Sequence, residues 1–263
     1  RGQVDAQVRT ELYTVTKNNG TRRTGILFKQ EDSNLAPTIY LEEFYQKYLK
    51  GQQVPDLADS ICSIYQEIRV KKTCDCQNLF DFNHVKEHIV YKLIRRDANE
   101  ELLKQIPYEP FLDLAVVYYI QIDNTRFGSA AIQIRNEHLR YWRVEKEEIR
   151  RLAEKDTPRI YPVQIRQIVR FMYVATNEQC SLGAAVMRYP DFREKVRGMI
   201  RGDFYILPSS IHEVILVPES FGLEPERMQE MVKEINQTGV APEEVLSDSV
   251  YYFDGEEIRI VAK

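Results

Sequence analysis

The sequence has few cysteines and no long apolar run. Its 263 residues include four cysteines, Cys62, Cys74, Cys76 and Cys180, with no obvious pairing scheme. So few cysteines in a chain that can bury most of its apolar surface favour free thiols in a reducing compartment over a disulfide scaffold. The longest apolar run, residues 114–120, is far shorter than the roughly 20 residues that cross a bilayer. We therefore expect a soluble, cytoplasmic protein without a membrane span.

The sequence also lacks an excess of charge of one sign. Acidic and basic residues are interspersed and sum to a net charge of −4, so nucleic-acid binding is not expected. Six arginines between residues 135 and 159 surround Tyr141 and Trp142. This segment is either a basic, aromatic surface or a solvated helical face whose arginines pair with glutamates. We favour the helical face because no block of like charge is present.

Signatures of common enzymes are missing as well. The chain contains no glycine-rich phosphate loop ending in Lys-Ser or Lys-Thr, no Gly-x-Ser-x-Gly elbow and no His-Glu-x-x-His helix. No common enzyme class is therefore indicated. The first residues, Arg1-Gly2-Gln3, contain neither an initiator methionine nor the start of a signal peptide, so we expect the numbered chain to begin inside a longer one.

The first hundred residues predict a small α+β lobe. Alternating β-forming residues flank Asn19-Gly20 and predict a hairpin. A short strand at 37–41 follows, and then two amphipathic helices that begin near Glu42 and Pro55. Pro107 and Pro110 precede a new apolar strand and predict a boundary. The expected division is an N-terminal lobe over residues 1–106 and a C-terminal lobe over residues 107–263.

The C-terminal lobe contains an apparent internal repeat. Residues 118–128 and 173–183 share the same spacing of aromatic, polar and small residues, and each is followed by a helix and then a strand. The pattern predicts an α+β fold with an antiparallel-rich sheet built from two hairpin-helix-strand units, closed by a hairpin over residues 250–261. A coincidence of common hairpin composition is the alternative. The strand centres predict a core that includes Val116, Tyr118, Ile132, Val186, Ile206 and Ile215.

Several segments resemble an uncharacterised family. They are LAPTIYL (35–41), LDLAVVYY (112–119), NEHL (136–139), LPSSIHEV (207–214) and VAPEEVLSD (240–248). In consistent order they resemble a domain of unknown function found mainly in Gram-positive gut anaerobes. The C-terminal lobe is more faintly similar to the YtpQ group of bacillar proteins. The resemblance implies a bacterial intracellular protein and supplies no catalytic residues.

The segment around Ser210, His212 and Glu213 contains residue types used in catalysis. On a strand, Ser210 and His212 share one face and Glu213 points to the other. A serine and a histidine two positions apart lie about 6 to 7 Å from each other, too far for the histidine to activate the serine. We favour a structural role, in which the serines bond to backbone groups of a turn and His212 makes a partly buried polar contact. Catalysis by His212 and Glu213 is the alternative.

His138 is a second candidate, at a predicted helix start. Asn136 suits the N-cap, and Glu137 suits the positive end of the helix dipole, so both residues are explained without a function. His138 facing a ligand site in a cleft is the alternative.

Cys74, Cys76, His84 and His88 form the third candidate cluster. Thiolates and imidazoles are the preferred ligands of structural zinc, and histidines four positions apart share a helix face. However, a single residue between two cysteines is tighter than the usual spacing. A protein of this size also does not need a metal to stabilise its core. We therefore expect no metal or other cofactor, with a zinc site as the alternative.

A well-patterned core without recognisable reaction machinery favours a binding protein. The expected function is noncatalytic binding of another protein or a small molecule in the groove between the two lobes. The alternative is an unrecognised hydrolase or transferase that uses His212 and His138 with carboxylates such as Glu213 and Glu137. Both histidines in one pocket with a carboxylate would favour the enzyme.

Overall fold

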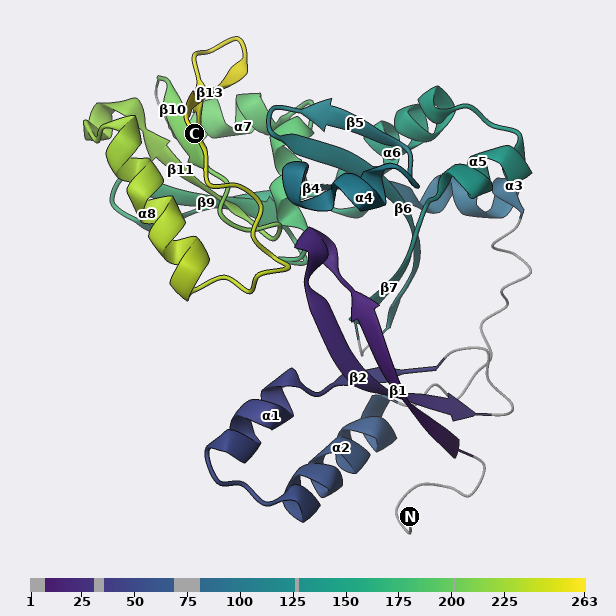
Figure 1. Cartoon of the computed structure of the whole chain (residues 1–263). Helices are drawn as coiled ribbons and strands as arrows, with labels where there is room; N and C mark the ends of the chain where they lie inside the picture. The colour runs from purple at the N-terminus through teal and green to yellow at the C-terminus, as the bar shows by residue number, and fades with distance from the viewer. Residues whose placement is uncertain (1–7, 31–35, 69–80, 126–127, 201) are drawn as a thin grey trace. The chain divides into compact units, whose positions relative to one another are not determined.

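The computed structural model describes residues 8–30, 36–68, 81–125, 128–200 and 202–263 (Figure 1). The chain consists of two compact units, Arg1–Leu79 and Phe80–Lys263. Helices and antiparallel strands occur in both, which confirms the predicted α+β class. Among the described residues, no helix combines the length and the apolar character that a membrane crossing requires.

The first unit is a three-stranded antiparallel sheet with two helices (Figure 1). Strands β1 (Val8–Thr16) and β2 (Arg22–Gln30) form the predicted hairpin, and β3 (Thr38–Tyr40) pairs with β2. Helices α1 (Glu42–Leu49) and α2 (Val54–Ile68) follow. The sheet and both helices contribute apolar side chains to one core: Phe28, Ile39, Phe44, Leu57, Ile61 and Tyr65.

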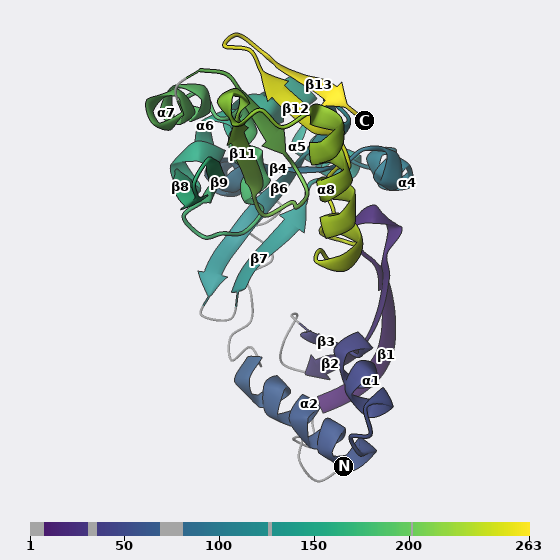
Figure 2. The same cartoon turned by 90° about the vertical axis from the view of Figure 1, so that its left-hand side faces the viewer.

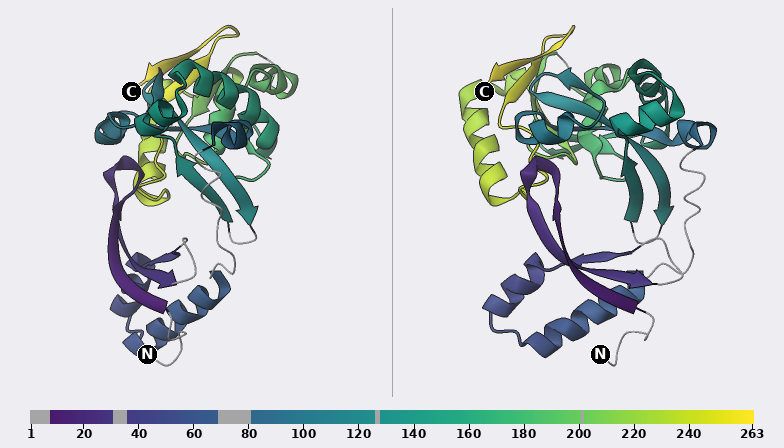
Figure 3. Two further views of the ribbon diagram at one scale, coloured as in Figure 1. Left: turned by 90° about the vertical axis from the view of Figure 1, so that its right-hand side faces the viewer. Right: turned by 45° about the vertical axis from the view of Figure 1, so that its right-hand side comes forward.

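The second unit contains a four-stranded sheet with β6 (Leu114–Thr125) at its centre. Strand β4 (Ile89–Arg95) pairs with one edge of β6. Strands β5 (Tyr108–Phe111) and β7 (Gly128–Gln133) pair with β6 near its start and its end. In Figure 3 the β6–β7 hairpin is a pair of long antiparallel strands in teal, a colour that it shares with neighbouring parts of the chain.

A six-stranded antiparallel sheet completes the second unit, in the order β13-β12-β10-β11-β9-β8. The strands are β8 (Val163–Val169), β9 (Met172–Asn177), β10 (Phe204–Leu207), β11 (Val214–Pro218), β12 (Val250–Phe253) and β13 (Ile258–Ala262). Figure 2 shows α8 (Pro225–Thr238) beside this sheet. Met228 and Val232 of α8 share a core with strand residues such as Val217. The predicted closing hairpin is β12–β13.

The other helices of the second unit connect these strands. The α-helices are α3 (Phe82–Val85), α4 (Glu100–Leu103), α5 (Asn136–Trp142), α6 (Lys146–Ile160) and α7 (Phe192–Met199). The 3-10 helices are η3 (Lys86–His88), η4 (Asp97–Asn99), η5 (Gly183–Arg188) and η6 (Glu219–Phe221), and η1 (Asn18–Gly20) lies in the hairpin turn of the first unit.

The division between the units differs from the expected one at residues 106/107. Strand β4 precedes that position but pairs along its whole length with β6. Residues 89–95 therefore belong to the second unit, and the observed division falls between Leu79 and Phe80. Pro107 lies just before β5 and Pro110 lies within it, so these prolines do not mark a boundary between units. The proposed groove between lobes 1–106 and 107–263 therefore does not correspond to a boundary between compact units.

The predicted repeat is wrong. Residues 128–133 form strand β7, but the matching residues 183–188 form the 3-10 helix η5. Leu182 adopts a positive φ of 54°, which turns the chain, and the N–H groups of Gly183 and Ala184 bond to the loop before β11. The expected strand near residue 160 is instead the last turn of α6. The two stretches therefore share a composition but not a topology.

The predicted core is largely confirmed. Val116, Tyr118, Val186 and Ile206 are buried, and Ile132 and Ile215 are half-buried. The strand phases inferred from the sequence are only partly correct, because Ile206 pairs with Leu216 and Ile215 pairs with Leu207, so Ile206 and Ile215 project from opposite faces of the six-stranded sheet. Val186 is buried as a residue of η5 and not as part of a strand.

Candidate functional site

His212 lies in the loop before β11 with both ring nitrogens engaged. Its Nδ1 accepts a hydrogen bond from the backbone N–H of Leu182 at 3.2 Å, and its Nε2 lies 3.3 Å from Oε1 of Glu244. An imidazole that accepts at Nδ1 carries its proton on Nε2, so Nε2 donates to Glu244. No ring nitrogen is left to accept a proton from Ser210. The Ser210 hydroxyl instead accepts the backbone N–H of His212 at 3.1 Å.

His138 has a different environment in α5. Its Nδ1 accepts the backbone N–H of Arg135 at 3.1 Å, and its ring stacks on Trp142 with 5.3 Å between ring centroids. Burial, and then the nearby charge of Arg135, lower the pKa of His138 and favour the neutral ring. In the described residues, His138 and His212 have no contact partner in common. Glu137 is exposed and Glu213 is half-buried.

The candidate cluster of two cysteines and two histidines lies only partly within the described residues. Cys74 and Cys76 lie outside the described residues. His84 is exposed in α3, with Nδ1 at 3.6 Å from Asp81, and His88 is exposed at the end of η3. Within the described ranges, no three histidine, cysteine or acidic residues are arranged to hold a metal ion. The zinc alternative stays a prediction.

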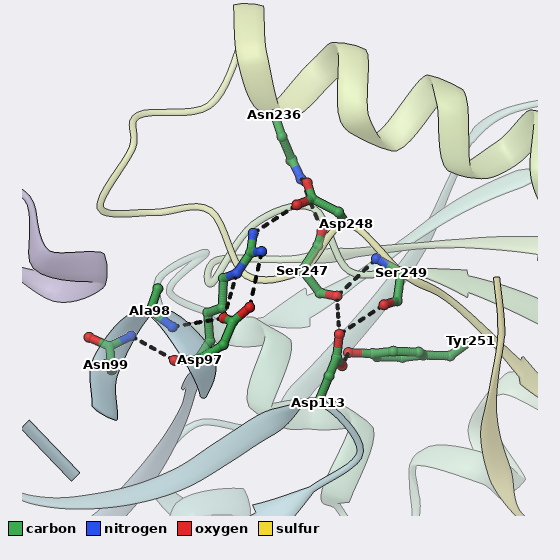
Figure 4. A network of polar contacts seen from close by, with 10 residues as sticks. Asp97, Ala98, Asn99, Asp113, Asn236, Ser247, Asp248, Ser249 and Tyr251 are labelled. Carbon is green, nitrogen blue, oxygen red and sulfur yellow. Dashed lines mark hydrogen bonds and ion pairs between the residues drawn. The ribbon is translucent and has the colours of Figure 1, made fainter. Parts of the chain in front are cut away.

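Asp113, between β5 and β6, accepts three hydroxyl hydrogen bonds (Figure 4). Ser247 and Ser249 donate to Oδ2 at 2.6 and 2.8 Å, and Tyr251 donates to Oδ1. All three donors are buried and lie in β12 or just before it. Burial, and then the charge of Asp113, raise the pKa of Tyr251. These bonds tie the four-stranded sheet to the six-stranded sheet.

Arg95 extends the same network at the end of β4, and its partners Asp97 and Asp248 are labelled in Figure 4. Its Nε lies 2.8 Å from Oδ1 of Asp97, and its Nη1 lies 2.8 Å from Oδ2 of Asp248. The hydrogen bond from Arg95 lowers the pKa of Asp97. Burial alone would raise the pKa of Asp248, but hydrogen bonds from Asn236 and Arg95 lower it below the ordinary value.

A pocket of about 250 Å³ adjoins this network. Its lining also includes Arg96, Lys233 and Lys263, so cations and carboxylates are mixed. The carboxylates Asp97, Asp113 and Asp248 already accept hydrogen bonds from the protein. A network whose donors and acceptors are matched stabilises a fold and has little capacity left for a ligand. We therefore interpret it as a structural tie.

Replacing Arg95 by methionine is expected to cost about 2 kcal/mol of stability at pH 7, because the bonded carboxylates lose a charged donor. Asp97 is largely exposed, so solvent screens its ion pair with Arg95. Most of the lost stability therefore comes from the ion pair between Arg95 and Asp248. Both carboxylates have a lowered pKa in the folded protein. The stability that these carboxylates contribute is therefore fully present above the pKa of the unfolded chain, about 3.9. It is lost as the pH falls through their lower pKa values in the folded protein.

Urea unfolding at pH 7 and at pH 2 to 3 measures this effect. The difference between wild type and Arg95→Met should shrink at the lower pH. Arg96→Met is the matched control, because Arg96 is exposed and makes no ion pair in the described residues. A penalty for Arg95→Met that is independent of pH would show that lost apolar contacts, and not the ion pairs, cause it.

A larger pocket of about 350 Å³ lies among β5, η5 and α7. We call it the Arg188 pocket. Its lining consists of two arginines and four apolar or aromatic residues: Phe111, Met187, Arg188, Tyr189, Pro190 and Arg193. No carboxylate is among these residues. Among the described lining residues there are therefore two positive charges and no carboxylate, and Glu154 pairs with Arg188 from outside the lining.

Arg188 is fixed at the end of η5 but retains bonding capacity. Its Nη2 lies 3.2 Å from Oε1 of Glu154, and its guanidinium carbon lies 5.3 Å from the centre of the Phe111 ring. Its Nε is buried and has no hydrogen-bond partner in the described part of the chain. Leaving a buried donor unpaired costs about 1–3 kcal/mol. A guanidinium has five N–H donors, and within the described residues Arg188 makes a hydrogen bond only to Glu154, so other donors are left for an anion.

Arg193 is held on the other side of the Arg188 pocket. Its Nη1 donates to the carbonyl of Glu256, and its guanidinium lies 5.5 Å from the centre of the Phe253 ring. A guanidinium has five N–H donors, so one bond leaves others for a ligand. Arg193 therefore adds a second, pre-positioned cation.

The sheet face that carries Phe111 also carries polar groups among its apolar side chains. Because Phe111 pairs with Leu114 and Glu109 pairs with Val116, Phe111 and Glu109 project from the same sheet face as Tyr118. Arg150 lies 3.4 Å from Glu109. The Tyr118 hydroxyl is buried without a hydrogen-bond partner in the described residues, and burial raises the pKa of Tyr118 and keeps it neutral.

Sequence reasoning missed the residues of both pockets. The predicted strand of small residues ended at Met187, and Arg188 directly after it was not considered, although an arginine within the apolar run 183–189 is an unusual choice for a buried segment. Asp113 interrupts the apolar run from Phe111 to Ile120 in the same way. A charged residue inside an apolar run was the available signal in both cases.

Comparison with known protein families gives one match. The model of a family described as "Family of unknown function (DUF5688)" matches residues 1–172 and 169–255. Together these two segments include most of the sequence. No curated protein and no solved structure matches the chain.

Proposed function

Since the chain belongs to this family of unknown function, which assigns no activity, we propose a function from the site itself. The protein binds a small anionic ligand in the Arg188 pocket and does not transform it. One observation carries this proposal: the pocket contains two arginines and no carboxylate, and Nε of Arg188 has no partner in the described residues. Charge-assisted hydrogen bonds from guanidinium groups are a strong and common means of binding carboxylates and phosphates.

The contacts of the candidate catalytic groups support binding over chemistry. Both nitrogens of His212 are engaged, and His138 accepts a backbone N–H and stacks on Trp142. A general base must have a free nitrogen within hydrogen-bond reach of the proton that it takes. The alternative of a hydrolase or transferase that uses these histidines therefore has no support from their contacts.

Titration calorimetry with inorganic phosphate and with citrate tests the proposal. We expect saturable binding to the wild type. Binding to Arg188→Met should be at least about tenfold weaker, because the variant loses charge-assisted hydrogen bonds to the anion and a loss of about 1.4 kcal/mol corresponds to a factor of ten. Affinity should also fall with added salt, since the interaction is electrostatic.

Arg151→Met is the matched control, because it removes one charge from an exposed ion pair on α6 and should leave the affinity unchanged. Arg188→Lys keeps the charge and shows whether geometry matters as well. Thermal melts confirm that each variant is folded. If neither anion binds, or if Arg188→Met binds as tightly as the wild type, the proposal is wrong.

The proposal also includes the expected setting of the protein. We propose a bacterial, cytoplasmic protein related to the YtpQ group, because its few cysteines suit a reducing compartment and its segments resemble that group. A small molecule is the proposed partner, in preference to nucleic acid, since the net charge is −4. The Arg188 pocket replaces the groove between lobes as the proposed place of binding, because it lies inside the second unit.

A further inference from the structure

The Arg188 pocket is larger than a bare inorganic anion requires. Its volume of about 350 Å³ lies within the range of about 300–1,000 Å³ that is typical of small-molecule sites. Four of its six lining residues are apolar or aromatic. An anion bound to the two arginines would leave the exposed parts of two of these four residues, Phe111 and Pro190, in contact with water. The shape and the lining therefore suit a ligand with an apolar part next to its charge.

The arrangement of Phe111 and Arg188 indicates a flat apolar part. The guanidinium carbon of Arg188 lies over one face of the Phe111 ring, 5.3 Å from its centre. The N–H groups of a guanidinium point outward in its own plane, where an anion can accept from them. Phe111 is half-buried, and Met187 and Tyr189 are buried beside it. A flat ring attached to the anion would contact the exposed parts of Phe111 and Pro190, because aromatic rings prefer offset or edge-to-face contacts.

We propose that the Arg188 pocket binds an aromatic anion, that is, a flat ring that carries a phosphate or carboxylate. This inference rests on the proposed function of anion binding. The anionic group bonds to the guanidinium edges of Arg188 and Arg193. The ring contacts Phe111 and Pro190, the two apolar lining residues with exposed surface. Burial of the ring supplies affinity that a bare anion lacks.

Calorimetric titrations with four probes test the ligand class. Phenyl phosphate should bind at least about tenfold more tightly than inorganic phosphate, because the ring adds apolar burial to the same charge-assisted bonds. Benzoate should bind more tightly than cyclohexanecarboxylate, which has the same charge and a similar size but no flat ring. Equal affinity for benzoate and cyclohexanecarboxylate would overturn the requirement for a flat ring.

A substitution at Phe111 separates the ring from the charge. Phe111→Leu keeps an apolar side chain, so we expect unchanged affinity for inorganic phosphate and loss of most of the preference for phenyl phosphate. Phe221→Leu is the matched control, because Phe221 is 44% exposed in η6, lies outside the pocket lining and contacts another ring, Phe171. It should leave every affinity unchanged.

The outcomes distinguish the two proposals. If phosphate and phenyl phosphate bind equally and Arg188→Met weakens both, anion binding stands and the aromatic ligand class is wrong. If none of the four probes binds, the proposed function is wrong and the ligand class with it. A preference for phenyl phosphate that survives in Phe111→Leu would show that the ring binds elsewhere, which also overturns the inference.

Discussion

Gly183→Ala is expected to destabilise the second unit by about 3 kcal/mol or more, the upper range for overpacking a buried site. A Cβ at this position would lie 2.1 Å from Oγ1 of Thr176, 2.5 Å from the carbonyl oxygen of His212 and 2.8 Å from the backbone nitrogen of Asn177. Two of these three atoms belong to backbone that cannot move without breaking strand and loop contacts. Gly183 is therefore required by close approach, because its φ is not in the positive range.

The chain provides a direct measurement and a matched control. Its one tryptophan, Trp142, lies in the second unit, so tryptophan fluorescence during urea unfolding reports on that unit. Gly198 lies in α7 with no atom within 4 Å of an added Cβ. Gly198→Ala should raise stability by up to about 1 kcal/mol, because alanine favours helix over glycine. Equal stability of the Gly183 and Gly198 variants would contradict the close approach.

Local signals predicted most helices and strands correctly. Asn19-Gly20 lies in the β1–β2 connection with positive φ at both residues, which these residue types tolerate. Pro55 lies near the start of α2, where a missing N–H costs little. These features depend on a few neighbouring residues. The sequence therefore contains all the information that they require.

The errors have a common physical cause, which is long-range contact. Residues 183–188 have the composition of a buried strand, but their N–H groups bond to the loop before β11 and not to a strand. Sequence periodicity does not reveal which distant segment supplies those acceptors. The Arg188 pocket has the same origin, since Phe111, Arg188 and Arg193 come from three different elements.

Asp113→Ala is expected to cost about 3–5 kcal/mol, because it leaves three buried hydroxyl groups without their acceptor and each such loss costs about 1–3 kcal/mol. The donors Ser247, Ser249 and Tyr251 are at most 2% exposed, so water cannot readily replace the carboxylate. The sheets joined by these bonds should separate earlier during unfolding. Trp142 fluorescence in urea measures the loss.

A conservative variant separates the acceptor from the charge. Asp113→Asn keeps one acceptor oxygen, so its cost should be smaller, about 1–2 kcal/mol. If alanine is tolerated as well as asparagine, the hydroxyl bonds contribute little and the structural tie is wrong.

Tyr251→Phe removes one donor and keeps the buried ring. Because Asp113 and Tyr251 are in direct contact, the cost of the double variant Asp113→Asn/Tyr251→Phe should be less than the sum of the single costs by about 0.5–1.5 kcal/mol. Strict additivity would show that Tyr251 is stabilised by burial of its ring alone.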